Sequence, residues 1–278
     1  MERETPAPPS RPTIQPPPPK RASIAETAGH FFAHFGQIAR MCVGVAGALF
    51  RRPLEFRSIL HQMEMIGVKS AGLAGVTALF TGMVMAVQFA FGLQKFGGME
   101  YTGRIIGLSF ARELAPALTA VIVGGRIGSG IAAEVGSMAV TEQIDAIRAL
   151  GADPIKKLVM PRVIASILVM PVLGALALVL GFGGAMFICA MEFDIPPGFF
   201  LRTALGSVNF VDYFSGMYKT PFFGGIIAVL GCHFGMITRG GTEGVGQSTT
   251  RTVVAVSICV LIADFVLTKI SVLMFPGR

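Results

Sequence analysis

Long uninterrupted apolar segments dominate the hydrophobic pattern of the chain. Residues 163–191 contain no charged side chain, and neither do residues 70–94. A helix of about 20 residues crosses the hydrocarbon core of a bilayer, so both segments are long enough to span it. The complete pattern predicts an all-α membrane protein with about five spans, over residues 67–93, 105–133, 163–191, 213–238 and 252–275.

The segment before the first span is amphipathic. Apolar residues recur at intervals of three and four from Phe31 to Leu49 and again from Phe56 to Met63, which is the spacing of one helix face. Residues 24–66 therefore form helices that lie either in the membrane interface or in the cytosol against the bundle, and the pattern does not separate the two. Residues 1–23 contain eight of the 17 prolines and predict a disordered tail.

Small side chains recur at every fourth residue of the first span. These residues are Ser70, Ala74, Ala78, Gly82, Ala86 and Ala90. Such a row lets a second backbone approach closely, which predicts helix packing inside the bundle or along a dimer seam.

Three connections separate the later spans. Residues 95–103 form a Gly-rich turn, residues 192–212 a polar connection and residues 239–251 a Gly-rich loop. Between the second and third spans, residues 134–162 contain a short amphipathic helix, with Val140, Ile144 and Ile147 on one face and Glu142 and Asp145 on another.

Composition and charge agree with a membrane location. The chain is 53% hydrophobic and 14% charged, with a mean hydropathy of +0.67, and this excludes an ordinary soluble domain. Its four cysteines have no paired spacing, which excludes a disulfide scaffold. The net charge of +7 reflects topology rather than nucleic-acid binding: 15 Lys and Arg fall on one side of the five spans and 5 on the other, which predicts a cytoplasmic N-terminus and an external C-terminus.

The motifs of soluble catalysis are missing from the sequence. It contains no phosphate-binding loop of the G-x-x-x-x-G-K-[ST] type and no G-x-S-x-G elbow, and its four histidines have no metal-ligand spacing. We therefore expect no catalytic residue, metal or cofactor in this chain. The glycines at 124 and 128, with Ala132, have the spacing of a tight helix contact.

Several ionisable side chains lie within the predicted spans. They are Arg112, Glu113, Arg126, Asp264 and Lys269. Two interpretations stay open. In one, Glu113 or Asp264 is neutralised by Arg126 or Lys269, or Arg112 pairs with Glu113, inside the bundle. In the other, these side chains line a polar route for a charged or amphipathic substrate.

Several stretches of the sequence resemble the MlaE/YrbE permease family, the membrane subunits of Mce-type ABC transporters. They are Glu113–Ala120, Gly125–Met138, Thr141–Ala146, Gly151–Arg162, Gly82–Gln88, Thr249–Val254 and Asp264–Thr268. The resemblance covers roughly residues 40–275, and the Pro-rich tail lies outside it.

The resemblance implies a homodimer in the bacterial inner membrane. Its partners would be cytoplasmic ATPase subunits, which bind ATP and Mg²⁺, and a ring of periplasmic Mce-domain proteins. The family also allows a small cytoplasmic accessory subunit. The substrate would be phospholipid or a similar hydrophobic lipid.

In such a permease, residues 134–154 would form the coupling segment that contacts the ATPase. The residues assigned to this contact are Glu134, Glu142, Gln143, Asp145, Asp153 and Pro154.

A lipid site is expected near the outer ends of the first two spans. Gln88 lies there beside the apolar Phe89, Phe91 and Leu93, and Arg112 and Glu113 lie near the same boundary. An arginine fork suits a phosphate group. In the competing interpretation, Arg112 and Glu113 pair only with each other or with an Mce-domain partner.

Two other functions remain as alternatives. The first is an ion-coupled secondary transporter in which Glu113 or Asp264 carries a proton, although no internal repeat is visible. The second is a membrane adaptor that transports nothing. Dependence on ATP, on an ion gradient or on neither separates the three functions.

Overall fold

The computed structural model describes residues 36–47 and 55–274. The long helices belong to one compact unit that begins at Gln37. The predicted tail, residues 1–23, lies outside the described residues. So do residues 24–35 and 48–54 of the predicted amphipathic segment.

The described part of the chain is a succession of helices. A helix over residues 36–47 comes first. It is followed by α2 (Phe56–Gln94), the 3₁₀ turn η1 (Met99–Tyr101), α3 (Thr102–Ser109), the π-helix η2 (Phe110–Leu118), α4 (Thr119–Val140), α5 (Gln143–Ala149), the π-helical turn η3 (Ile155–Val159), α6 (Met160–Glu192), α7 (Pro197–Ser207), α8 (Phe210–Met217), α9 (Lys219–Met236) and α10 (Gly241–Met274).

Four helical segments of the described chain are long and apolar enough to cross a membrane. They are Phe56–Gln94, Met99–Val140, Ile155–Glu192 and Gly241–Met274. The predicted all-α membrane fold is thus confirmed. The segment predicted as the fourth of five spans, residues 213–238, is divided between α8 and α9 and is not among these four. A count of five spans therefore stays a prediction.

Two element boundaries differ from those expected. Residues 56–66 are the first turns of α2 instead of a separate helix, because Gly67 continues the helix and faces Val169 of α6. Residues 241–251 begin α10 instead of forming a loop. The chain reverses more tightly than expected because Gly240 and Gly241 adopt φ angles of 88° and 66°, a left-handed conformation that costs glycine little.

The row of small residues on α2 is buried along its whole length, as the sequence predicts. It packs against α6, where glycines again allow close approach. A Cβ atom on Gly82 would overlap the carbonyl oxygen of Gly181, and one on Gly184 would overlap that of Leu79. The two backbones are therefore in direct contact, and van der Waals packing stabilises this pair of helices.

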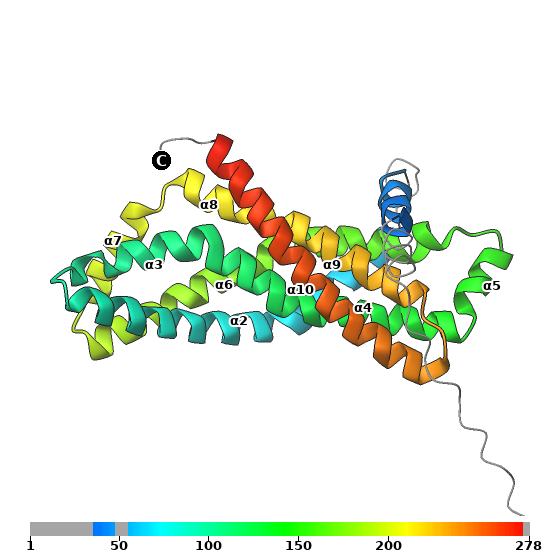
Figure 1. Ribbon diagram of the computed structural model, residues 1–278, viewed down its shortest axis with the longest axis horizontal. Coiled ribbons are helices and arrows are strands. Elements are labelled where there is room, and N and C mark those ends of the chain that lie inside the picture. The colour runs from blue at the N-terminus through cyan, green and yellow to red at the C-terminus, as the bar shows by residue number, and fades with distance from the viewer. Residues whose placement is uncertain (1–35, 48–54, 275–278) are drawn as a thin grey trace, which may run out of the picture. The chain divides into compact units, whose positions relative to one another are not determined.

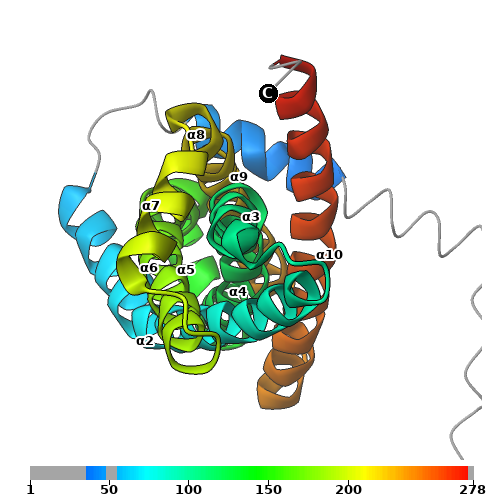
Figure 2. The same ribbon diagram turned by 90° about the vertical axis from the view of Figure 1, so that its left-hand side faces the viewer.

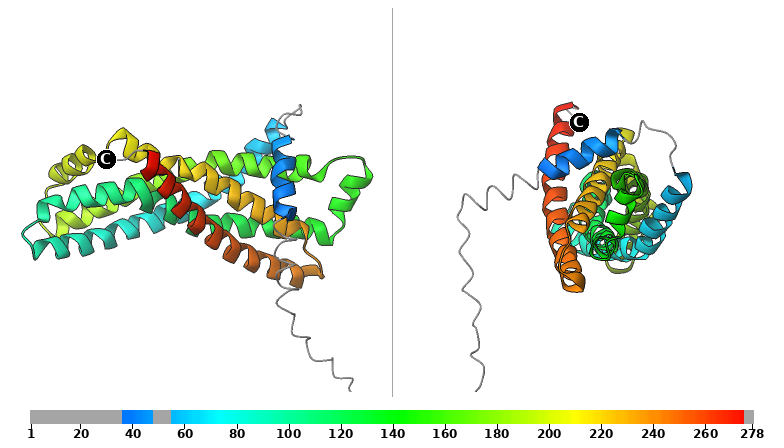
Figure 3. Two further views of the ribbon diagram at one scale, coloured as in Figure 1. Left: turned by 45° about the horizontal axis from the view of Figure 1, so that its top comes forward. Right: turned by 90° about the vertical axis from the view of Figure 1, so that its right-hand side faces the viewer.

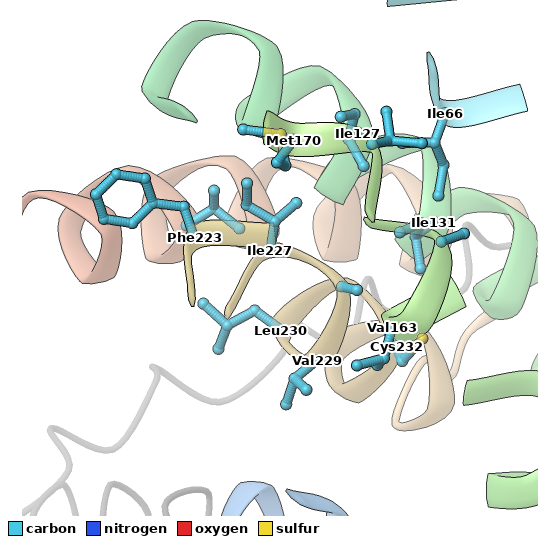
Figure 4. Packing of buried hydrophobic residues seen from close by; sticks show 14 of the residues in the cluster. Ile66, Ile127, Ile131, Val163, Met170, Phe223, Ile227, Val229, Leu230 and Cys232 are labelled. Atoms are coloured by element: carbon cyan, nitrogen blue, oxygen red, sulfur yellow. The ribbon is translucent and has the colours of Figure 1, made fainter. Parts of the chain in front are cut away.

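The main hydrophobic core lies among α2, α4, α6, α9 and α10 (Figure 4). Phe223 and Ile227 of α9 are fully buried there against Ile127 and Ile131 of α4. A Cβ atom on Gly124 would come within 2.6 Å of Ile227, so the predicted close contact of α4 is confirmed. A second cluster, around the buried Phe110 and Phe200, joins α3, η2, the end of α6 and α7.

Helix α10 crosses the others obliquely, and α5 and α7 lie at opposite ends of the long helices (Figure 1). Views along the bundle show α10 on its outer side (Figures 2 and 3). Much of α10 is consequently exposed, with large apolar side chains such as Phe265 and Leu261 facing outward. A lipid environment or another apolar surface is required to cover them.

We predict that the contact between α2 and α6 tolerates no added carbon atom. Replacing Gly82 by Ala should lower the free energy of unfolding by about 1–3 kcal/mol, because the new methyl group forces the two backbones apart. The measurement is the melting temperature of the purified chain in mild detergent. Gly72→Ala on the same helix is the matched control, since nothing lies within 4 Å of a Cβ atom there. Equal melting temperatures for the two variants would contradict the prediction.

Candidate functional site

A buried lysine connects three helical segments. Lys219 is the first residue of α9, and its side chain is 1% exposed. Its Nζ lies 2.8 Å from Oε2 of Glu113 in η2 and 3.2 Å from Oδ1 of Asp264 in α10. It also donates to the hydroxyl of Thr268 at 2.7 Å. One ammonium group thus binds two carboxylates from elements far apart in the sequence.

Proline residues explain why the polar groups lie where they do. Pro116 has no N–H to donate to the carbonyl of Arg112, the acceptor in a regular α-helix, and Nζ of Lys219 lies 3.3 Å from that oxygen. Pro221 likewise leaves the carbonyl of Met217 without its usual donor, and the hydroxyl of Thr220 donates to it at 2.8 Å. The interruptions in η2 and between α8 and α9 therefore meet at the charged cluster.

A second ion pair lies beside the first. Nε of Arg112 donates to Oδ1 of Asp212 at 2.9 Å, and the Nη2 atom of the same guanidinium also contacts this oxygen. Oδ2 of Asp212 accepts the N–H of Asn209 at 2.9 Å, in the capping box that begins α8. The Asp212 side chain is 7% exposed and that of Arg112 is 39% exposed, so the arginine is the accessible partner.

The two ion pairs line a pocket of about 430 Å³. Its polar wall consists of Arg112, Glu113, Asp212 and Lys219 with the hydroxyls of Ser109, Ser215, Thr268 and Ser271, and its apolar wall of Leu108, Val211 and Val272. Together with Asp264, this cluster contains three carboxylates and two cations, a formal charge of −1. We name this pocket the Lys219 pocket.

The lining of the Lys219 pocket has groups that can bind a ligand. It offers donors and acceptors beside an apolar wall, and it contains neither a histidine nor a cysteine. In the described residues, no three His, Cys, Asp or Glu side chains come together to form a site for a metal ion. An amphipathic ligand is the kind of molecule that this lining would accommodate.

The sequence identified only part of this site. Arg112, Glu113 and Asp264 come together in one cluster, where their partners are Asp212 and Lys219, not Arg126 or Lys269. Lys219 was missed because it was counted with the external loops. The signal that could have found it is its position inside the predicted span 213–238, where a charged residue requires a partner.

The remaining intramembrane cations lie elsewhere. Arg126 of α4 donates to the hydroxyl of Ser70 at 2.7 Å, and that serine is fully buried in α2. Lys269 is exposed on α10 and forms no ion pair with any residue in the described ranges. The predicted pairing of either residue with Glu113 or Asp264 is therefore wrong.

The four residues expected to contact lipid on the first span lie apart from the Lys219 pocket. Gln88, Phe89, Phe91 and Leu93 occupy the last turns of α2, and none of them lines that pocket. Phe89 packs partly against the cluster around Phe110, whereas Phe91 is exposed beneath Nζ of Lys95, which lies 4.6 Å from the ring centroid. Their contact with lipid stays a prediction.

The predicted coupling segment forms an exposed helical knob. Helix α5 has seven residues and begins after Glu142, whose φ angle is 60°. Ile144 anchors the helix in the core, while Asp145 is exposed and ion-paired with Arg148 at 2.7 Å. Gln143 is exposed as well and donates to the hydroxyl of Thr141 at 3.1 Å.

Three residues assigned to the same segment have structural contacts of their own. Oδ1 of Asp153 accepts the N–H of Ile155 at 2.9 Å, and Pro154 is buried. Glu134 belongs to α4 rather than to the knob, and its Oε1 lies 2.6 Å from the buried guanidinium of Arg162 in α6. The Glu134–Arg162 ion pair therefore joins α4 to α6 beside the knob, and the Asp153 contact lies in the turn before η3.

Comparison with known proteins gives consistent matches. The family model described as Permease MlaE matches residues 59–270. A probable ABC transporter permease protein of Synechocystis is 44% identical over 221 residues, which cover 80% of this chain and 83% of the relative. A probable ABC transporter permease protein of Rickettsia conorii is 34% identical over 248 residues, with 89% of this chain and 96% of the relative covered.

A plant protein is also similar. TRIGALACTOSYLDIACYLGLYCEROL 1, chloroplastic, of Arabidopsis thaliana is 39% identical over 221 residues. The match covers 80% of this chain and 63% of the plant protein, so the chain spans less than two thirds of that relative.

We predict that Lys219 is required for stability. Lys219→Met should lower the free energy of unfolding by about 1–3 kcal/mol, because Asp264, whose side chain is 18% exposed, loses its partner, whereas Glu113 at 41% exposed is partly solvated. The melting temperature in mild detergent measures the effect, and Lys269→Met is the control at an exposed cation. Adding Asp264→Asn to Lys219→Met should recover part of the loss. A Lys219→Met protein as stable as the control variant would disprove this role.

Proposed function

The chain belongs to the MlaE permease family, and from this premise we propose that it moves phospholipid or a similar hydrophobic lipid as the membrane subunit of an ATP-binding-cassette transporter. The transfer takes place between the bacterial inner membrane and a periplasmic Mce-domain protein. Family membership supports the permease role, and the sequence resemblance supports the Mce partner. The Arabidopsis relative bears the name of a glycolipid, which agrees with a lipid substrate.

The observation that carries the lipid proposal is the amphipathic lining of the Lys219 pocket. Arg112 and the serine hydroxyls face the same space as Leu108, Val211 and Val272. A phospholipid presents both chemistries, since a charged head group adjoins acyl chains. The guanidinium of Arg112 uses two of its nitrogens on Asp212, so N–H groups remain that can bind a phosphate oxygen.

The net charge of the cluster favours one class of lipid head group over another. With three carboxylates and two cations, the Lys219 pocket has one negative charge in excess. A zwitterionic head group, in which a phosphate is followed by an amine, therefore fits better than a purely anionic one. Its amine would be attracted by the carboxylates while its phosphate contacts Arg112.

The proposed assembly contains a second copy of this chain, cytoplasmic ATPase subunits, the Mce-domain protein and, where present, a small accessory subunit. ATP and Mg²⁺ bind to the ATPase, because this sequence lacks a phosphate-binding loop. Basic residues at the α5 end of the helices, such as Arg148, Lys156 and Lys157, support a cytoplasmic position for that end. The exposed knob α5 is then available to the ATPase.

The two carboxylates that bind Lys219 also support a second candidate function. Glu113 and Asp264 share one ammonium group, and a carboxylate that gained a proton would release its hold on Lys219. This geometry would serve an ion-coupled carrier. Energy source separates the two functions, because an ABC transporter needs ATP and its ATPase, whereas a carrier needs only an ion gradient.

We predict ATP-dependent lipid transfer that requires Arg112. The complex, co-purified from its native membrane and reconstituted in vesicles, should transfer labelled phospholipid to the Mce-domain protein only when ATP is present. Arg112→Gln should reduce the rate about tenfold, as expected for one lost charge-assisted hydrogen bond. Arg104→Gln, an exposed arginine of α3 outside the Lys219 pocket, is the control. Transfer driven by an ion gradient without ATP would favour the carrier instead.

A further prediction concerns α5. Glu142→Lys combined with Asp145→Lys should leave the chain folded, since both side chains are exposed and lysine adds no new strain at the φ angle of 60°. The double variant should lose most ATP-driven transfer, because the ATPase meets a knob of reversed charge. Co-purification and the ratio of lipid transferred to ATP hydrolysed measure the effect. Glu100→Lys, an exposed carboxylate in η1, is the control. Unchanged coupling would make α5 a passive connection.

A further inference from the structure

A second pocket lies among the first turns of α2, the second half of α4 and the first turns of α10. Its volume is about 600 Å³. Met65 and Ile66 of α2, Ile127 and Ile131 of α4 and Val253 of α10 supply an apolar wall. Lys69 and Arg126 lie on the same lining, so this pocket is amphipathic as well. We name it the Arg126 pocket.

The two cations of the Arg126 pocket have no carboxylate partner. No ion pair joins Lys69 or Arg126 to any acidic side chain of residues 36–47 or 55–274. Nη1 of Arg126 donates to Ser70, and the other nitrogens of its guanidinium form no hydrogen bond within the described part of the chain. The acidic residue of the lining, Glu134, is already ion-paired with Arg162 at 2.6 Å.

This electrostatic arrangement is the reverse of that in the Lys219 pocket. There, both cations are ion-paired and a carboxylate is in excess. In the Arg126 pocket, two positive charges face the open space. Apart from Glu134, which is already ion-paired, the other polar groups of the lining are neutral: an amide and the hydroxyls of Ser129, Thr249 and Thr250. Unpaired cations beside an apolar wall attract an anion that carries its own apolar part.

The position of the Arg126 pocket along α10 identifies the source of that anion. Thr250 lines this pocket and Thr268 lines the Lys219 pocket, and 18 residues of helix separate them, roughly 27 Å. Because α10 crosses the other helices obliquely, the separation along the bundle is shorter than this, and the two pockets lie toward opposite ends of the long helices, with the Arg126 pocket nearer the α5 end (Figure 1). Val68 and Val254, the sequence neighbours of the lining residues Lys69 and Val253, are exposed apolar side chains.

We propose that the Arg126 pocket binds the phosphate of an anionic phospholipid from the leaflet on the α5 side of the helices. Lys69 and Arg126 bind the phosphate, and the isoleucines of α4 contact the beginning of the acyl chains. This proposal goes beyond the proposed function, because it concerns lipid that stays bound in the absence of ATP and of any partner chain.

The test measures lipid retained by the purified full-length chain. The chain in mild detergent is mixed with equal parts of phosphatidylglycerol and phosphatidylcholine and washed, and the retained lipid is quantified by mass spectrometry. The wild-type chain should retain phosphatidylglycerol preferentially. Lys69→Gln combined with Arg126→Gln should reduce this retention at least about tenfold, since two charged contacts are lost.

Two further variants show whether charge at this position matters. Lys269→Gln removes an exposed cation of α10 outside both pockets and should retain as much phosphatidylglycerol as the wild type. Arg126→Lys preserves the charge and should retain more than Arg126→Gln. Equal retention by the double variant and the wild type would overturn the proposal, as would an equal loss in Lys269→Gln.

A competition experiment distinguishes a lipid phosphate from a free anion. Inorganic phosphate, which has no acyl chains, should not displace the retained phosphatidylglycerol. Displacement by inorganic phosphate would show a free-anion site and overturn the lipid proposal. The double variant could instead lose the association between two copies of the chain while it still retains phosphatidylglycerol. That result would also overturn the lipid proposal. Because neither ATP nor a partner is present, failure of ATP-driven transfer would leave these results unchanged.

Discussion

The burial of a single ammonium group constrains the part of the structure where η2, α9 and α10 meet. Lys219 is almost completely removed from solvent, and an ammonium ion in such a place is stable only beside negative charge. Glu113 precedes Lys219 in the sequence and Asp264 follows it, and both supply that negative charge. The helices that carry them therefore cannot separate from α9 without leaving the ammonium group of Lys219 unpaired. Nζ of Lys219 also lies 3.3 Å from the carbonyl oxygen of Arg112, to which Pro116 has no N–H to donate.

Elsewhere the helices are joined by shape rather than by charge. The contact of α2 with α6 depends on backbone approaching backbone at Gly82 and Gly181, and that of α4 with α9 depends on Gly124 beside Ile227. Such contacts leave no room for rearrangement within each pair. The structure therefore combines two kinds of helix contact: close backbone packing at the glycines, and ion pairs around Lys219 that line a pocket.

The sequence determined most of the helical framework but not its long-range contacts. Periodicity at every fourth residue identified the buried row of α2 from Ser70 to Ala90, because burial of small side chains leaves a local pattern. The partners of Arg112 and Glu113 could not be deduced in this way, since Asp212 and Lys219 are about 100 residues distant and only the tertiary fold brings them near. The start of α10 was also missed, because the helix accepts Gly244 and Gly246 that local propensity assigns to a loop.

The connection between α5 and the Lys219 pocket follows from the continuity of the second long segment. Helix α4 runs without interruption from Thr119 to Val140, roughly 33 Å, and joins the π-helix that carries Arg112 and Glu113 to the exposed knob at its other end. A force on α5 is therefore transmitted to η2 along one rigid helix. Because Glu113 belongs to η2 and Lys219 to α9, a shift of α4 relative to α9 would change the distance between these two side chains.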